Sequence, residues 1–225
     1  MLVAPGDIDV VVTRVAIDDD TVRVSASMLA ASERRRAERF IHDRDRRRFI
    51  VRRARLRRLL AERLDVPAES LRFSETARGK LELSAPFDSA GLRFSLTHCE
   101  DLAVYALSSR ADVGVDAEAI RDLPDADDIA ALSFSTREYA TYRRLAARDK
   151  PLGFLNCWTR KEAFVKATGC GLGDPLDFFD VSLAPSEPPR ILRVNDRTGD
   201  DCGWSLASFS PAPRFVAALV TKRPS

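Results

Sequence analysis

Two acidic residues, Asp116 and Glu118, stand two positions apart in a β-branched segment. Alternate side chains of a strand point to the same face, so we expect Gly114 and both carboxylates on one surface, with Val113 and Val115 on the other. Mg²⁺ takes oxygen ligands and usually keeps waters while bridging substrate phosphates, so a pair of carboxylates suits it. Gly114 would then let a phosphate approach closely. Taken alone, such a pattern is more often a polar strand edge leading into a turn.

A second group of chemically useful residues lies further along the chain. Trp158, Glu162 and Lys166 recur every four residues, so on a helix they form one slowly drifting stripe. A carboxylate and an ammonium on that stripe could serve a metal and a phosphate. An ordinary Glu–Lys helix pair beside a buried tryptophan explains the same spacing.

Three smaller features could donate hydrogen bonds to phosphate. Lys80 follows a glycine in a predicted turn, and Thr97 and His98 come at the end of a predicted strand. Ammonium, hydroxyl and imidazole groups are all competent phosphate donors, although each is more often a simple turn residue. The sequence offers neither a Ser-His-Asp arrangement nor a G-x-x-x-x-G-K-[ST] loop.

The charge is unevenly distributed. The net charge is +2, yet residues 33–65 hold 14 arginines against 6 acidic residues. A basic segment on an otherwise acidic protein indicates an anionic partner, such as a phosphate ligand, an acidic protein or nucleic acid. A solvated, arginine-rich helix is the alternative.

Hydrophobic periodicity indicates mixed helices and strands around these residues. Ser32 before Glu33 is typical of a helix N-cap. We expect helices at 44–64, 129–147 and 155–167, and strands at 8–15, 71–73, 81–83, 92–96, 102–107, 113–116, 191–194, 204–208 and 215–220. Strand, helix and hairpin thus occur once before Ser108 and again after it, which favours two similar α+β halves.

Composition excludes several classes of protein. With 225 residues and 45% hydrophobic content, the chain can bury a substantial core. It has no run of about 18 apolar residues and no signal-like start, so we expect a cytoplasmic protein without membrane contact. The four cysteines are scattered, which predicts reduced thiols rather than a zinc site or disulfides: Cys99, Cys157, Cys170 and Cys202.

Taken in order, the motifs resemble those of the Sfp-type 4'-phosphopantetheinyl transferases. The resemblance spans about residues 32–172 and rests on Gly79-Lys80, Leu96-Thr97-His98, Gly114-Val115-Asp116-Ala117-Glu118, Phe134-Ser135-Thr136-Arg137-Glu138 and Trp158-x-x-Lys161-Glu162-Ala163-x-x-Lys166. Two positions depart from the family pattern. Leu81 replaces a usual proline, and Thr97-His98-Cys99 replaces Ser-His-Ser.

The resemblance implies an α+β pseudo-dimer of two similar subdomains, with the active site in the cleft between them. We expect an N-terminal half at 1–108 and a C-terminal half at 109–225. The implied enzyme is monomeric and magnesium-dependent. It moves the phosphopantetheine arm of coenzyme A to a serine of an acyl or peptidyl carrier protein, in fatty acid, polyketide or nonribosomal peptide biosynthesis.

The same resemblance implies roles for particular residues. Asp116, Glu118 and Glu162 would hold Mg²⁺, with Glu162 also the candidate base for the carrier serine. Lys166 would contact the pyrophosphate and stabilise the departing adenosine bisphosphate.

Further coenzyme A contacts are implied in the N-terminal half. Lys80 and His98 would contact the pyrophosphate, and Thr97 keeps a hydroxyl for coenzyme A. The candidates for its 3'-phosphate and adenine side are Arg36, Arg48 and Arg53.

In this family the carrier protein also contacts the segment after the carboxylate pair, here 120–132, with Leu123 and Ile129 as apolar candidates. Carrier proteins are typically acidic around the serine, so the basic half would steer their approach. Two alternatives stay open at this point. One is a nucleic-acid-binding module that uses the helix around 44–58. The other is a catalytically silent coenzyme A binder.

Overall fold

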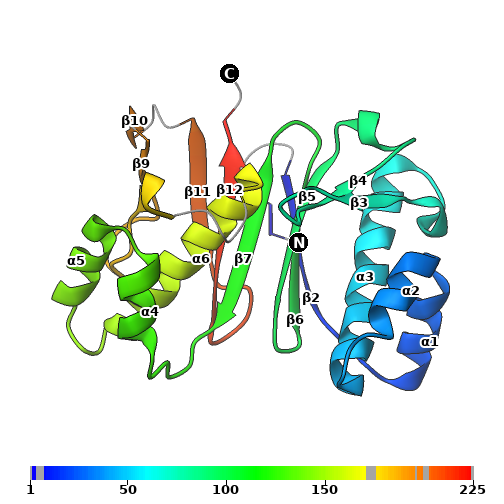
Figure 1. Cartoon of the computed structure of the whole chain (residues 1–225), viewed down its shortest axis with the longest axis horizontal. Helices are drawn as coiled ribbons and strands as arrows, with labels where there is room; N and C mark the ends of the chain where they lie inside the picture. The colour runs from blue at the N-terminus through cyan, green and yellow to red at the C-terminus, as the bar shows by residue number, and fades with distance from the viewer. Residues whose placement is uncertain (1, 4–7, 171–175, 196, 200–202, 224–225) are drawn as a thin grey trace.

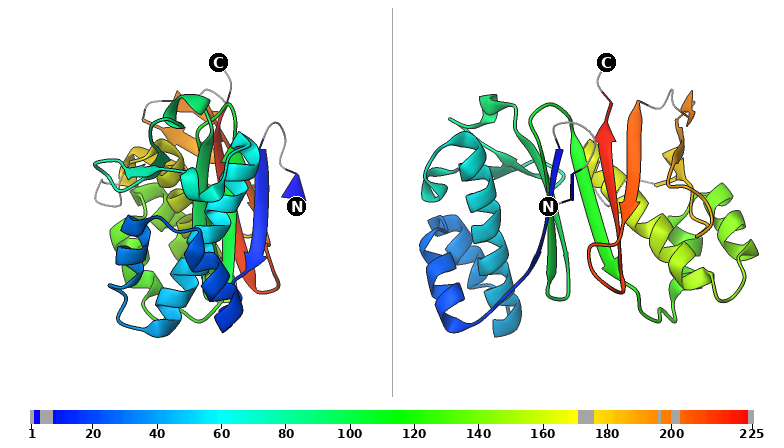
Figure 2. Two further views of the ribbon diagram at one scale, coloured as in Figure 1. Left: turned by 90° about the vertical axis from the view of Figure 1, so that its right-hand side faces the viewer. Right: turned by 180° about the vertical axis from the view of Figure 1, so that it is seen from behind.

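The computed structural model describes residues 2–3, 8–170, 176–195, 197–199 and 203–223. Its elements form four layers, with two β-sheets at the centre and helices on both outer sides (Figure 1). The view from behind shows the same order of layers (Figure 2). Within the described part of the chain, no helix is long and apolar enough to cross a membrane.

The N-terminal half carries a four-stranded sheet in the order β1-β2-β6-β5, and a separate β3-β4 hairpin. Its helices are α1 (Asp19–Ser27), α2 (Ala31–Ala37) and α3 (Asp43–Leu64). Its strands are β1 (Leu2–Val3), β2 (Ile8–Arg14), β3 (Phe73–Glu75), β4 (Leu81–Leu83), β5 (Arg93–Cys99) and β6 (Leu102–Ser108).

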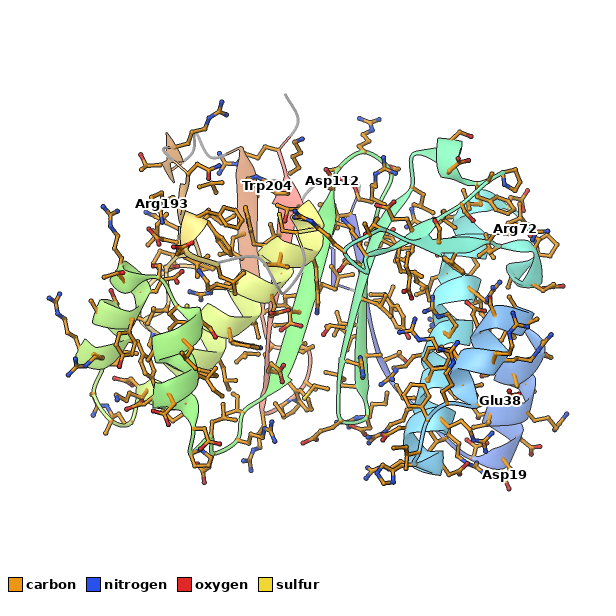
Figure 3. The ribbon with its side chains drawn as sticks, in the orientation of Figure 1. Asp19, Glu38, Arg72, Asp112, Arg193 and Trp204 are labelled. Atoms are coloured by element: carbon orange, nitrogen blue, oxygen red, sulfur yellow. The ribbon has the colours of Figure 1, made fainter. Side chains whose placement is uncertain are left out.

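The C-terminal half carries two three-stranded sheets, β11-β12-β7 and β10-β9-β8. Its helices are α4 (Ala126–Ser133), α5 (Thr136–Arg144) and α6 (Lys150–Thr168). Its strands are β7 (Val113–Ala119), β8 (Phe179–Val181), β9 (Ile191–Val194), β10 (Arg197–Thr198), β11 (Trp204–Phe209) and β12 (Phe215–Lys222). Trp204 packs edge-on against Phe164 of α6, with ring centroids 5.2 Å apart (Figure 3).

Strand β6 shows why the two central sheets lie back to back. All of its residues are buried, so both of its faces must be covered. Val104 belongs to a core cluster with Val115 and Leu219 of the second sheet. Tyr105, on the opposite face, packs in a cluster with Leu60 of α3. A continuous apolar run therefore positions one sheet between α3 and the other sheet.

Helix α6 lies unusually close to β7, and Gly114 makes this possible. A Cβ atom at Gly114 would lie 2.0 Å from the backbone oxygen of Ala163 and 2.4 Å from the backbone nitrogen of Ala167. The expectation that Gly114 makes room for a phosphate is therefore wrong, because helix backbone already fills that space. The predicted faces of β7 are confirmed, since Val113 and Val115 point into the core between the sheets.

Most expected elements are confirmed, together with the α+β class and its two halves. The expected helix at 129–147 is wrong as one element, because Ser135 caps a new helix by accepting a hydrogen bond from the backbone of Glu138. Helix α6 begins five residues earlier than expected, since Pro151 is tolerated in a first turn.

The N-terminal helices differ from the expected ones, and three of the four cysteines lie within the described residues. Helix α2 begins after Ala30 rather than Ser32, because the Glu33 carboxylate accepts from the Ala30 backbone. Helix α1 was not expected. The cysteines at 99, 157 and 170 are free thiols, whereas position 202 lies outside the described residues.

Candidate active site

Asp116 is the central residue of the site. It lies on β7 facing α6 and is 4% exposed. Its Oδ1 accepts hydrogen bonds from Lys166 Nζ at 2.6 Å and from Thr97 Oγ1 at 2.9 Å. Its Oδ2 is buried without a hydrogen-bond partner. One carboxylate oxygen is thus held by two donors, and the other is left available to a ligand.

Glu162 lies on α6 one helical turn before Lys166. It is buried, and its Oε1 has no hydrogen-bond partner. Burial raises the pKa of Glu162 to about 7; Lys166 opposes this shift, and the negative charges of Asp116 and Glu118 add to it. The ion pair of Lys166 is with Asp116 rather than with Glu162, so an ordinary Glu–Lys helix pair does not explain this stripe.

Glu118 lies beside these two carboxylates at the end of β7. Burial, followed by the charge of Asp116, raises the pKa of Glu118. Burial raises the pKa of the nearby Cys99 thiol, and the charge of Glu118 adds to this shift. The carboxylates of Asp116, Glu118 and Glu162 are therefore close enough for their negative charges to raise the pKa of Glu118 and Glu162.

The carboxylates of Asp116, Glu118 and Glu162 are the candidate ligands for a metal ion. In the parts of the chain that the structure describes, no group of three or more His, Cys, Asp or Glu side chains is already arranged to hold a metal. The unpartnered oxygens of Asp116 and Glu162 nevertheless fit a cation, since a buried carboxylate oxygen without a partner is costly. Two carboxylates suffice for Mg²⁺ when phosphate and water complete its octahedron.

A cavity of about 350 Å³ opens beside these residues. One wall comes from the turn at Gly79 and from β5, and the other comes from α6, including Glu162 and Lys166. Lys80 also lines it, and its Nζ donates to the backbone oxygen of Ala167 at 3.0 Å. Burial lowers the pKa of Lys80. The cavity therefore lies between the two halves and places two ammonium groups near a buried carboxylate.

Thr97 and His98 occupy opposite faces of β5. Thr97 is buried and points to β7, whereas His98 lies on the opposite side of the strand and is itself exposed. Desolvation, followed by the charges of Arg52, Lys166 and Arg48, lowers the pKa of His98 to about 4. At neutral pH the imidazole is therefore uncharged.

Arg48 and Arg53, which were both predicted to contact coenzyme A, lie on different faces of helix α3. Arg48 lies close enough to His98 to affect its pKa. Arg53, five residues later, is 9% exposed and lies between the rings of Phe49 and Phe73. Five residues turn a helix through about 140° beyond a full turn, so the two arginines cannot share a face.

Sequence reasoning missed Arg52. Burial lowers its pKa to about 10, and it is the first of the charges that act on His98. Its spacing of four residues from Arg48 was the available signal. Arg36 lies apart from this pair, since it forms an ion pair with Glu75.

The segment at 120–132, which was expected to contact a carrier protein, packs partly against the core of the C-terminal half. Leu123 and Ile129 are half-buried and pack against the C-terminal core. Leu132, at the end of α4, is 88% exposed. The segment thus presents a different apolar side chain from the two that were expected.

Comparisons with known proteins match both halves. The 4'-phosphopantetheinyl transferase superfamily matches residues 112–220, and the family described as 4'-phosphopantetheinyl transferase, N-terminal, matches residues 18–110. The chain is 34% identical to 4'-phosphopantetheinyl transferase HetI of Nostoc sp. over 86% of this chain and 78% of that protein. It is 28% identical to 4'-phosphopantetheinyl transferase psf-1 of Bacillus pumilus, over 93% of this chain and 87% of that protein. It is 31% identical to human L-aminoadipate-semialdehyde dehydrogenase-phosphopantetheinyl transferase, over 68% of this chain and 52% of that protein. These matches cover both halves of the fold and every element of the site, and the chain belongs to the 4'-phosphopantetheinyl transferase superfamily.

Proposed function

We propose that this 4'-phosphopantetheinyl transferase performs its reaction where α6, β5 and β7 meet, with Mg²⁺ held by Asp116, Glu118 and Glu162. The observation that carries the proposal is the pair of buried, unpartnered oxygens on Asp116 and Glu162. Glu162 also lines a cavity with two ammonium groups, which suits a substrate with several phosphate charges.

The reaction transfers one group and breaks one phosphoanhydride bond. Coenzyme A is the donor, and a serine hydroxyl of a carrier protein attacks the phosphorus that bears the pantetheine arm. The bond between the two phosphates breaks, giving holo-carrier and adenosine 3',5'-bisphosphate. A bound Mg²⁺ would neutralise charge on the pyrophosphate as this bond breaks.

The chain's own residues supply the other tasks. Glu162 accepts the proton of the serine hydroxyl, since its carboxylate lines the cavity in which the reaction takes place. Lys166 and Lys80 offer ammonium groups to the pyrophosphate, and Lys166 also stabilises the departing bisphosphate. We assign His98 and Arg48 to contacts with the phosphates of coenzyme A.

The remaining contacts with coenzyme A stay predictions. Arg53 already forms an ion pair with Glu33 at 3.5 Å. Arg36 already forms an ion pair with Glu75. Arg52 lies with Arg48 and His98 and is the stronger candidate for the 3'-phosphate. A phosphate role for Thr97 competes with its hydrogen bond to Asp116.

The partner is proposed to be an acidic carrier domain, steered by the arginines of the N-terminal half. The halves at 1–108 and 109–225 stay part of the proposal, which is supported by two matched ranges that end and begin at residues 110 and 112. Monomeric state, cytoplasmic location and the biosynthetic pathway stay predictions. The nucleic-acid alternative gains no support from these relatives.

The direct test incubates the purified protein with an apo carrier protein, coenzyme A and graded Mg²⁺. Mass spectrometry should show one phosphopantetheine added per carrier, with a rate that vanishes in chelator and returns with Mg²⁺. Asp116→Ala should abolish transfer while circular dichroism shows an unchanged fold. Normal turnover by this variant at limiting Mg²⁺ would remove Asp116 from the metal site.

A further inference from the structure

A row of polar side chains on β5 runs along β7. Ser95, Thr97 and Cys99 point toward β7, alternating with residues that face α3, and the first two are buried. Ser95 Oγ accepts a hydrogen bond from the backbone of β7 at 3.1 Å. Thr97 donates a hydrogen bond to the carboxylate of Asp116. The N-terminal half thus holds the strand that carries the carboxylates.

Thr97 makes the most consequential of these contacts. A hydroxyl has a single proton, and Thr97 directs it to Asp116 Oδ1 at 2.9 Å. The same proton cannot be given to a phosphate at the same time. Both partners are buried, at 6% and 4% exposure, so water does not compete strongly for the bond.

Oδ1 of Asp116 is also the atom that Lys166 engages. Two donors on one oxygen fix the rotation of the carboxylate and leave Oδ2 unpartnered. The hydrogen bond from Thr97 remains even if Lys166 turns toward a substrate phosphate, because Thr97 lies on a packed strand rather than at the tip of a long side chain.

We propose that Thr97 is a positioning residue for the transfer reaction, which fixes Asp116 so that its Oδ2 faces the cation. This inference rests on the proposed function, in which Asp116 is a metal ligand. It gives the hydroxyl a different task from that of the neighbouring imidazole. Thr97 faces β7 and His98 the opposite side of β5, so the two side chains do not act on one phosphate group together.

The test measures cation binding rather than activity alone. Mn²⁺ would be titrated by calorimetry into the full chain with coenzyme A present. Thr97→Val keeps the shape and removes the donor, so the Mn²⁺ dissociation constant should rise by about tenfold, the effect of losing one hydrogen bond to a charged group. Thr97→Ser should restore near wild-type affinity. Binding of coenzyme A without metal should stay unchanged in both variants.

A matched control comes from another buried threonine. Thr159 is 1% exposed and its hydroxyl donates to the backbone oxygen of Leu155 within α6. Thr159→Val makes the same chemical change away from the carboxylates, and it should leave Mn²⁺ affinity unchanged. If Thr97→Val proves unstable, Thr97→Ala removes the same donor without added bulk and should give the same weakening.

Two results would overturn the inference. Unchanged Mn²⁺ affinity in Thr97→Val would show that Thr97 does not position Asp116. Weaker binding of coenzyme A to this variant without metal would show that Thr97 contacts a phosphate of coenzyme A. Asp116→Asn separates these failures from failure of the proposed function. If Asp116→Asn abolishes Mn²⁺ binding and Thr97→Val does not weaken it, only the role of Thr97 is wrong. If Asp116→Asn binds Mn²⁺ normally, the metal assignment is wrong and the role of Thr97 falls with it.

Discussion

Glu138 of α5 and Lys161 of α6 form an ion pair inside the C-terminal half, with Nζ 2.8 Å from Oε2 and side chains only 1% and 3% exposed. The backbone N–H groups of Ser135 and Val181 also donate to Glu138, and Lys161 donates to the backbone oxygen of Phe179. The pair therefore ties together α5, α6 and β8. Both residues belong to the motifs that resemble the family, yet their task is to hold the helix that carries Glu162.

Glu138→Ala should destabilise the protein by about 3 to 5 kcal/mol, because it leaves the Lys161 ammonium buried and unpaired. Glu38→Ala is the matched control, since Glu38 is exposed on the outer side of the N-terminal helices (Figure 3). Denaturant unfolding measures both. Equal stability of the two variants would show that the buried pair contributes nothing to folding.

Gly114→Ala should lower both stability and turnover. The added Cβ would meet the backbone of Ala163 at 2.0 Å, so α6 must move away from β7. Such overpacking typically costs about 1 to 3 kcal/mol, and movement of α6 shifts Glu162 and Lys166 relative to Asp116. Thermal unfolding and the transfer assay test this together. A stable variant with a selective loss of coenzyme A affinity would instead restore the idea that Gly114 makes room for phosphate.

His98 should titrate with a pKa of about 4 in the ligand-free protein, compared with its ordinary 6.5. The folded protein then resists protonation between these values while the unfolded chain accepts it. Stability should therefore be unaffected by His98 above about pH 6.5 and should fall as the pH drops from there toward 4.

Nuclear magnetic resonance can follow this ring directly, because the chain has only 2 histidines and His42→Gln identifies the other signal. His98→Gln should flatten the acid loss of stability. A ring that titrates near 6.5 would show that neither desolvation nor the neighbouring positive charges act on His98.

Glu162→Gln should reduce turnover by at least about a hundredfold while coenzyme A still binds, since a positioned base and a metal ligand are lost together. Glu38→Gln removes a charge of the same kind from the surface and should have no effect. If Glu162 is a metal ligand only, saturating Mg²⁺ should recover much of the rate. Near-normal turnover at every Mg²⁺ concentration would contradict both roles.

Sequence patterns predicted those elements whose burial has a simple period. The helix expected at 44–64 and the strand expected at 102–107 match α3 and β6 within a residue or so, because their apolar residues follow the helical period or form an unbroken run. The junction between α4 and α5 was missed, since Ser135 sits in an otherwise continuous helical pattern and only its capping geometry ends one helix and begins the next.

The positions of the candidate site residues were predictable where these residues lie within one motif. The strand position of Asp116 and the helical stripe of Glu162 and Lys166 follow from local spacing. Thr97 and Arg52 were assigned differently or missed, because their roles depend on contacts across the fold. Helix phase separates Arg52 from Arg53, and only the approach of β5 to β7 shows that the Thr97 hydroxyl meets a carboxylate.

We propose that the unpartnered oxygens of Asp116 and Glu162 bind the metal ion that acts on coenzyme A. The most direct measurement is a crystal structure with coenzyme A and Mn²⁺, in which anomalous scattering locates the ion. We predict a Mn²⁺ peak in contact with Asp116 Oδ2, a Glu162 carboxylate oxygen and the coenzyme A pyrophosphate. A pyrophosphate held in the cleft with no ion on these two carboxylates would contradict the account.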